Sequence, residues 1–361
     1  CLTRSARTLN RGGQPGLARK DYEKAISIFR AINSDEEIST RRSLGHLYES
    51  SLSDYDTAEK IFKQALSMAQ EREKPKQIRS LQLDFIRLLY TKGQYDKAME
   101  ALTAAMAKQE NLSAAEKLTL RLEIAKVAWY QGNYAKARQE QTHALEIALE
   151  FGWTFQEIQA RSLGGLIAMN LGDLDTARIS MMDALGLAKR TGRLSEVAIQ
   201  ANNLGNVLRE RGQYEEAIEY YETALDIEDR AKNLEGRAYA LRNMGLTYAR
   251  MDQPEKAQKI LRDALTLSKS IGNRYNELQC VLAIAEVEEN IGAPTAQLSW
   301  TTAANLSRQM ALPEALWRAL FGMGRVTEDP SQSELFFEGA LLVLEQLGGG
   351  QTQAVAKYSA Q

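Results

Sequence analysis

The sequence predicts an all-α fold, an α-solenoid in which similar helix pairs are stacked one after another. Three observations predict it. The strong helix formers Ala, Leu, Glu, Lys, Arg and Gln dominate the composition, a pattern recurs about every 40 residues, and each recurrence holds two small residues seven positions apart. Aromatic residues make up 7% of the 361 residues and Pro occurs six times, so strand formers and helix breakers are both scarce.

Rows of small residues mark the repeating unit. The first small residue of each unit recurs mostly at steps of 39 or 40, at Ala25, Ala58, Ala98, Ala137, Ala177, Ala217, Ala257 and Ala296. A second follows seven residues later at Ala65, Ala105, Ala144, Ala184, Ala224, Ala264 and Ala303. Seven residues are two helical turns, so both residues lie on one face and let two helices approach closely.

Two sets of helix-ending residues divide each unit into two helices. Gly93, Gly132, Gly172 and Gly212 each precede the second helix, and we expect them to adopt the left-handed conformation that Gly tolerates. The second set closes each unit, at Gly152, Gly192, Asn233 and Gly272. One helix pair cannot bury its own apolar face, whereas a stack of pairs can, so the units should form one continuous core.

The best-formed unit resembles the tetratricopeptide repeat. The resemblance rests on Leu204-Gly205-Asn206 followed by Gly212, Tyr214, Ala217, Tyr221, Ala224 and Leu225. The period near 40 is similar to the long repeats of LGN/Pins polarity scaffolds, of kinesin light chains and of bacterial arrays that precede a CHAT-type protease domain. The resemblance covers residues 20–346 and implies a right-handed superhelix of about eight antiparallel helix pairs that binds partners and carries no catalytic site.

The two ends are expected to differ from the array. Residues 1–19, with three Gly, one Pro and four Arg, are interpreted as a flexible tether, and residues 347–361, with a triple Gly, as a flexible tail. Residues 20–32 resemble a second helix without its first, and residues 314–346 resemble a final pair. A chain beginning at Cys1 is typical of mature bacterial lipoproteins, so Cys1 is a candidate lipidation site; the alternative is a chain trimmed at an arbitrary point.

Composition argues against most kinds of chemical site. The formal net charge of −2 offers no general attraction for nucleic acid, and no apolar run approaches the length of a membrane span. His46 and His143 lack a Cys or Ser partner at a recognisable spacing, and Cys280 lies in an apolar helical context. The carboxylates of Glu286, Glu288 and Glu289 spread around a helix and do not converge. We therefore expect no catalytic residues, no cofactor, no metal and no small-molecule substrate.

The candidate binding site is the concave groove that the first helices of such arrays line. By the pattern of the family, the ligand-facing positions are Arg42, His46, Arg87, Tyr90, Lys126, Trp129, Tyr130, Asn202, Asn203, Asn206, Arg209, Arg242, Asn243 and Arg250, with Glu286 and Glu289 making the seventh unit acidic. Asn can pair with a bound backbone, Arg can hold carboxylates and aromatic rings can anchor side chains. The alternative is that these are ordinary polar positions on a solvated face.

The carboxylate clamp of chaperone-tail-binding repeats is incomplete here. Asn206 and Asn243 suit two of its ligands, but Asn202 replaces its first Lys, and Leu282 and Glu286 replace its last pair. The sequence therefore does not predict capture of a free C-terminal carboxylate.

Three functions remain open at this point. The leading hypothesis is a protein- or peptide-binding scaffold, lipid-anchored in a bacterial cell-envelope assembly at the outer membrane or in the periplasm. The alternatives are a cytoplasmic peptide-sensing regulator and the recognition module of a CHAT-type protease. The regulators carry an amino-terminal helical module, for which residues 1–19 look too short and too rich in Gly.

Overall fold

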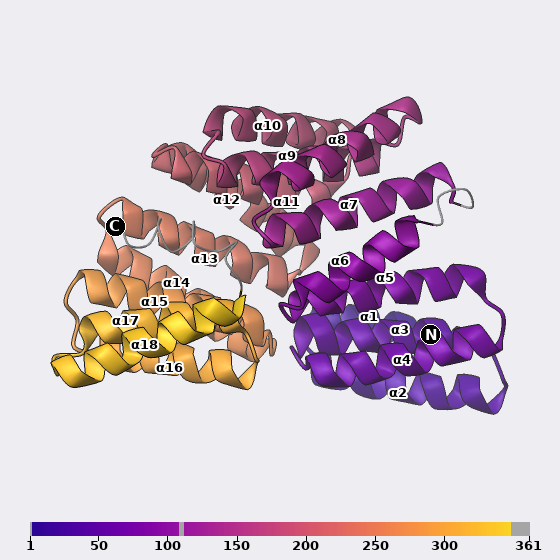
Figure 1. Ribbon diagram of the computed structural model, residues 1–361, viewed down its shortest axis with the longest axis horizontal. Coiled ribbons are helices and arrows are strands. Elements are labelled where there is room, and N and C mark those ends of the chain that lie inside the picture. The colour runs from indigo at the N-terminus through magenta and orange to yellow at the C-terminus, as the bar shows by residue number, and fades with distance from the viewer. Residues whose placement is uncertain (1, 108–111, 348–361) are drawn as a thin grey trace.

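The computed structural model describes residues 2–107 and 112–347, and within these ranges every regular element is a helix (Figure 1). The first helices of the pairs are α1 (Leu2–Arg11), α3 (Glu36–His46), α5 (Pro75–Thr91), α7 (Ala114–Tyr130), α9 (Thr154–Asn170), α11 (Leu194–Glu210), α13 (Leu234–Arg250), α15 (Arg274–Asn290) and α17 (Pro313–Val326). The second helices are α2 (Pro15–Ala31), α4 (Tyr55–Glu71), α6 (Tyr95–Met106), α8 (Tyr134–Glu150), α10 (Leu174–Arg190), α12 (Tyr214–Ala231), α14 (Pro254–Ser270), α16 (Ala296–Gln309) and α18 (Pro330–Leu347). A π-helical turn, η1 (Leu47–Ser51), extends α3. The predicted all-α solenoid is confirmed.

Helix boundaries follow the local signals in the sequence. Gly93, Gly132, Gly172 and Gly212 have φ between 72° and 78°, as expected for residues that end a helix. Asn233 differs from the expectation: it caps α13 by accepting a hydrogen bond from the Gly236 amide at 3.3 Å, while Lys232 before it takes the left-handed conformation at φ 52°. Ser113 starts α7 with a capping box completed by Glu116.

The small residues lie where the helices of a pair meet. Ala58, Ala98, Ala137, Ala177, Ala217 and Ala257 are fully buried, and Tyr221 and Leu261 fill the neighbouring space in the largest core cluster. Glycines of the first helices serve the same purpose, because a Cβ at Gly205 would lie 2.6 Å from the Tyr221 ring. The two predicted rows therefore mark the core, although Ala105 is only half-buried.

The amino-terminal end forms a helix pair where a tether was expected. Ala6 in α1 and Ala18 in α2 are fully buried against one another's helices, and Tyr22 and Leu44 complete that cluster. The Gly and Pro residues that resemble a linker form the turn instead, since Gly13 has φ +71° and Pro15 starts α2. Residues 20–32 thus have a first helix before them, and the described array holds nine pairs.

Two expectations at the termini cannot be placed. Cys1, the candidate lipidation site, and residues 348–361 of the expected tail lie outside the described residues. Among the described residues, no helix is long and apolar enough to cross a membrane. The lipid on Cys1 remains a prediction.

The solenoid curves so that its ends meet (Figure 1). Gly13, in the turn between α1 and α2, packs against Leu234 of α13 and Ile271 at the end of α14. Tyr95 of α6 donates a hydrogen bond of 2.5 Å to Glu314 of α17, 219 residues away. First helices of successive pairs touch one another, and second helices make no comparable contact within the described chain. The first helices therefore line the concave side.

Candidate functional site

Polar side chains on the concave side link each first helix to the next. The partners lie about one repeat apart in sequence: Arg42 contacts Asp84 of the next first helix, Arg87 contacts Glu123, and Arg242 contacts Asn276. Between α3 and α7 these links are ion pairs, whereas between α9 and α15 they are hydrogen bonds that involve amide side chains. The site thus has two chemically different halves.

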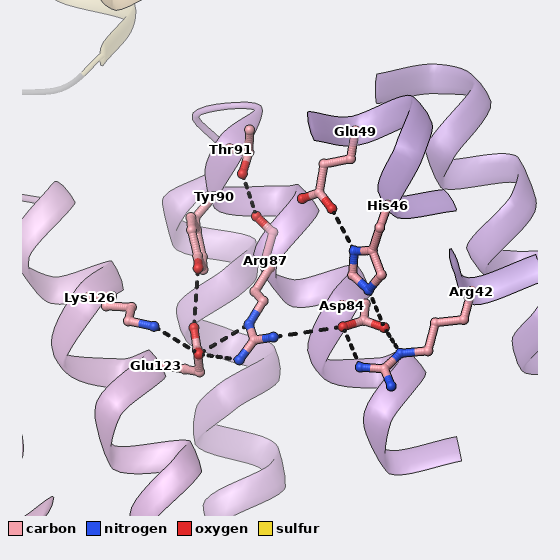
Figure 2. Close-up of polar contacts among 9 residues, drawn as sticks. All are labelled: Arg42, His46, Glu49, Asp84, Arg87, Tyr90, Thr91, Glu123 and Lys126. Carbon is pink, nitrogen blue, oxygen red and sulfur yellow. Dashed lines mark hydrogen bonds and ion pairs between the residues drawn. The ribbon is translucent and has the colours of Figure 1, made fainter. Parts of the chain in front are cut away.

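Asp84 anchors the first part of the charged half (Figure 2). Its carboxylate is fully buried on α5 and accepts hydrogen bonds from Nε and Nη2 of Arg42 on α3. Nε2 of His46 lies 3.4 Å from the same carboxylate, and Nδ1 of His46 lies 3.2 Å from Glu49. The imidazole also packs edge-on against the ring of Phe62.

These contacts set the charges of the buried groups. Burial opposes the positive form of His46, but its hydrogen bonds to Asp84 and Glu49 outweigh burial and raise its pKa to about 9. Burial also raises the pKa of Asp84, and the hydrogen bonds from His46 and Arg42 more than offset this and hold it below its ordinary value. At neutral pH the imidazole is therefore a cation and the carboxyl an anion.

Glu123 on α7 anchors the second part (Figure 2). Glu123 is buried, and its carboxylate accepts from Arg87 at 2.7 Å, from Lys126 at 3.2 Å and from the Tyr90 hydroxyl at 3.2 Å. Burial raises the pKa of Glu123, but the charges of Lys126 and Arg87 lower it below its ordinary value. Nη1 of Arg87 also reaches within 3.8 Å of Asp84, so the two anchors belong to one network.

The cations of this network remain partly open to solvent. The side chains of Arg42, His46, Arg87 and Lys126 are 38%, 40%, 36% and 36% exposed, whereas those of Asp84 and Glu123 are 0% and 2% exposed. We call these four residues the cationic strip. The sequence pointed to the strip but missed the two carboxylates beneath it.

The second half of the concave side is built from amides. Asn243 donates to Asn202 at 2.9 Å, Asn203 donates to Ser162 at 3.3 Å, and Arg242 donates to Asn276 at 2.8 Å. Asn243 was expected to face a ligand, but it is 4% exposed because it is enclosed between Asn202 and Arg242. Asn206 accepts from the Tyr221 hydroxyl at 2.9 Å. We call Asn202, Asn203, Asn206, Asn243 and Asn276 the amide strip.

Tyrosine rings gather where the two ends of the solenoid meet. Tyr130 stacks on Tyr90 and on Tyr95, with ring centroids 5.5 and 5.6 Å apart, and Trp129 lies beside it at 4.8 Å. Burial, together with the nearby Tyr275 and Glu314, raises the pKa of Tyr130 to about 12. Tyr275 of α15 is thus near enough to Tyr130 of α7 to influence its titration. Sequence reasoning missed it, because the family pattern places ligands at the other end of a first helix.

Tyr130 and Tyr275 are nevertheless 37% and 40% exposed. Large rings surrounded by protein and yet reached by solvent are typical of a concave binding surface. We call Tyr90, Tyr95, Tyr130 and Tyr275 the tyrosine wall. The Trp129 indole N–H beside it is buried without a hydrogen-bond partner among the described residues.

The remaining residues singled out by the sequence lie elsewhere. Arg209 contacts Asn206 and Glu210, and Arg250 is exposed at the end of α13. Glu286 and Glu289 are paired with Arg318 and Arg325 of α17, both at 2.7 Å, so the seventh unit is not a free acidic surface.

The chemically reactive residue types do not come together. Cys280 is buried, and burial raises the pKa of its thiol to about 11. His143 of α8 lies 3.1 Å from Arg121 of α7, and the contact is partly buried. Across residues 2–107 and 112–347, no three His, Cys, Asp or Glu side chains are arranged to hold a metal ion.

Comparison with solved structures finds the same fold in several proteins, two of which are in complex with peptides. A Rap protein complexed with Competence and Sporulation Factor is 13% identical, with a TM-score of 0.65 over 96% of this chain and 97% of that one. The Rap conjugation gene regulator of plasmid pLS20, in complex with the Phr* peptide, is 16% identical, with a TM-score of 0.59 over 94% and 96%. NprR in complex with its cognate peptide NprX is 20% identical, with a TM-score of 0.58 over 79% and 85%.

Sequence comparison agrees with the fold. No curated protein matches the chain significantly. The family profile described as tetratricopeptide repeat matches residues 1–71 and 196–270, which include the newly found first pair and the best-formed unit. The chain therefore carries tetratricopeptide repeats over those two segments, and across the array it is similar in fold to the Rap protein.

Proposed function

We propose that this chain binds an extended peptide along the concave side of its solenoid and acts as a peptide-responsive interaction protein. The observation that carries the proposal is the tyrosine wall. Tyr130 is exposed to solvent and stacks on Tyr95, whose hydroxyl donates a hydrogen bond to Glu314, 219 residues away in sequence, so the curvature of the whole array creates the surface. Aromatic rings held in such a place are effective anchors for peptide side chains.

The amide strip supports the same proposal. An Asn side chain offers two donor hydrogens and one acceptor oxygen, and the hydrogen bonds of Asn202 and Asn203 use only part of that capacity. Both side chains are half-buried, so their unused groups can pair with the backbone of a peptide. The solved structures of similar fold include proteins in complex with peptides, which favours a peptide ligand over the alternative of a large folded partner.

The peptide-sensing regulator becomes a stronger alternative to a lipid-anchored scaffold. Its objection was that residues 1–19 are too short for a helical module, but these residues are part of a helix pair that extends the array. The similarity to Rap spans 96% of this chain and 97% of that one. A CHAT-type recognition module gains no comparable support.

The test is selection of ligands by the intact chain. Immobilised protein is exposed to a library of linear peptides of about ten residues, and enriched peptides are measured by calorimetry. We expect Tyr275→Ala to weaken binding by about tenfold or more, roughly 1.4 kcal/mol, because it removes an aromatic anchor. Tyr214→Ala, on the outer helix α12, is the matched control and should bind like the wild type. The proposal fails if no peptide is enriched, or if both variants bind equally well.

A further inference from the structure

We infer that the bound peptide is acidic and that its carboxylates lie along the cationic strip of α3, α5 and α7. The inference rests on the proposed function and adds the chemical class of the ligand and its placement. The tyrosine wall would take apolar or aromatic side chains next to it, since Tyr90 belongs to the wall and donates to Glu123 beneath the strip.

The charges on the strip are unequal at the surface. Four cations, Arg42, His46, Arg87 and Lys126, stand over two carboxylates, those of Asp84 and Glu123. Glu49, 17% exposed, adds a third carboxylate, which leaves an excess of one positive charge. The carboxylates are buried and each cation is more than one-third exposed, so a ligand meets positive charge first. Because the chain as a whole carries −2, this attraction is local to the concave side.

Hydrogen-bond donors remain available on the strip. Arg42 directs Nε and Nη2 at Asp84, which leaves Nη1 without a contact to that carboxylate. Lys126 has three donor hydrogens and uses one on Glu123. The carboxylates beneath hold these groups in place before any ligand arrives, which lowers the entropy lost on binding. Charged donors fixed in this way favour carboxylate ligands.

A purely structural role does not account for so much charge. The amide strip links α9, α11, α13 and α15 at the same helix spacing without any ion pair between them. Stacking of these repeats therefore does not require cations on the concave side. The cations are confined to the half that contains Tyr90 and Tyr130 of the tyrosine wall, as expected if the ligand itself supplies negative charge there.

The geometry also predicts a spacing within the ligand. Neighbouring packed helices lie about 10 Å apart, and an extended peptide advances about 3.4 Å per residue. Carboxylates about three residues apart would therefore reach Arg42 or His46 on α3, Arg87 on α5 and Lys126 on α7.

The experiment compares two blocked peptides of about ten residues, acetylated and amidated, with Glu or Gln at every third position and one central Leu. Binding of each to the full chain is measured by fluorescence anisotropy at low and at high salt. We expect the Glu peptide to bind at least about tenfold more tightly at low salt and to lose most of that preference at high salt. Equal affinity of the two peptides at low salt would overturn the inference.

Variants locate the binding to the strip. Lys126→Gln should weaken the Glu peptide by about fivefold and leave the Gln peptide unchanged; Glu123 keeps Arg87 and Tyr90 as partners, so the fold should persist, as thermal unfolding will verify. The matched control is Lys189→Gln, an exposed cation on the second helix α10, for which we expect less than about a twofold change. An equal loss in both variants would contradict the inference.

Two further outcomes separate the inference from the function it rests on. If library selection enriches peptides without acidic residues and Tyr275→Ala abolishes their binding, the proposed function stands and the inference fails. A single-stranded oligonucleotide of similar length that binds the strip more tightly than the Glu peptide would also overturn it, because the strip would then serve phosphates. Absence of binding by any peptide would remove the proposed function first.

Discussion

The cationic strip and the amide strip both lie on first helices of the same array, but different kinds of side chain link the neighbouring helices in each. In one half, Arg42 and Arg87 reach to buried carboxylates of the next helix, and in the other half Asn243 and Asn203 reach to neutral oxygens. The helices in both halves begin 39 or 40 residues apart, at Pro75, Ala114, Thr154, Leu194, Leu234 and Arg274. Stacking is therefore set by the small residues of the core, and the chemistry of the concave side is free to vary along the array.

Removing an ion pair of the charged half should lower the free energy of unfolding much more than removing an amide hydrogen bond of the other half. Asp84→Ala should lower the free energy of unfolding by about 3 kcal/mol, because it leaves Arg42 and His46 without their shared buried counter-charge. Asn202→Ala removes one neutral hydrogen bond and should cost about 1 kcal/mol. Urea unfolding of the two variants, followed by circular dichroism, measures both values.

Arg42→Ala is the control for Asp84→Ala. Arg42→Ala should cost less than Asp84→Ala, because His46 and Arg87 remain beside the Asp84 carboxylate in the first variant, whereas the second removes the counter-charge of all three cations. If Asp84→Ala and Asn202→Ala lowered stability equally, the two halves would be equivalent in energy and the distinction between them would be chemical only.

The two halves should also differ in how much stability they lose when a glycine of a first helix is replaced by Ala, because the side chain packed against that glycine is rigid in one half and flexible in the other. Gly45 in α3 lies against the ring of Phe62, and Gly165 in α9 lies against Met181, whose Cε would be 2.8 Å from an added Cβ. Gly45→Ala should cost about 2 kcal/mol, because a ring held in the core cannot yield without displacing its surroundings. Gly165→Ala should cost less than about 1 kcal/mol, because Met is flexible. Calorimetric melting of both variants tests the order, and a larger loss for Gly165→Ala would contradict it.

The scaffold could be predicted from the sequence because every helix pair packs through the same arrangement of small and large apolar residues. Residues equivalent to Ala217 and Leu204 recur at the period of the array. Both Ala217 and Leu204 are buried, as predicted for core positions. The first pair was missed because Gly13 and Pro15, which form its turn, also occur in linkers, and only the burial of Ala6 and Ala18 distinguishes the two. Local composition cannot decide such a case, whereas tertiary contact can.

The candidate site was predictable only in part. The pattern identified Arg42 and Arg87 as concave residues, but not Asp84 or Glu123, which follow them by 42 and 36 residues and were assigned no role. These carboxylates could have been predicted by looking for residues of opposite charge about one repeat apart in the sequence. Tyr275 and Glu314 had no such signal, because their neighbours Tyr130 and Tyr95 lie several units away and meet them only through the curvature of the array.

The dependence of stability on pH should also distinguish the two halves, because only the charged half of the concave side contains a histidine. The folded pKa of His46, about 9, is above its ordinary value of 6.5. The stabilising contribution is therefore complete below pH 6.5 and is lost as the pH rises through 9. The side chain is 40% exposed, so solvent screening reduces this contribution to about 1 kcal/mol. Asp84, whose pKa is held below its ordinary value, keeps its negative charge across this window, and Arg42 and Glu49 are the other charged groups of this cluster. The free energy of unfolding should fall between pH 6 and pH 9.5 in the wild type and fall less in His46→Gln, whereas Asn202→Ala should follow the wild type. A His46→Gln variant with the same pH profile as the wild type would show that the loss arises outside the strip.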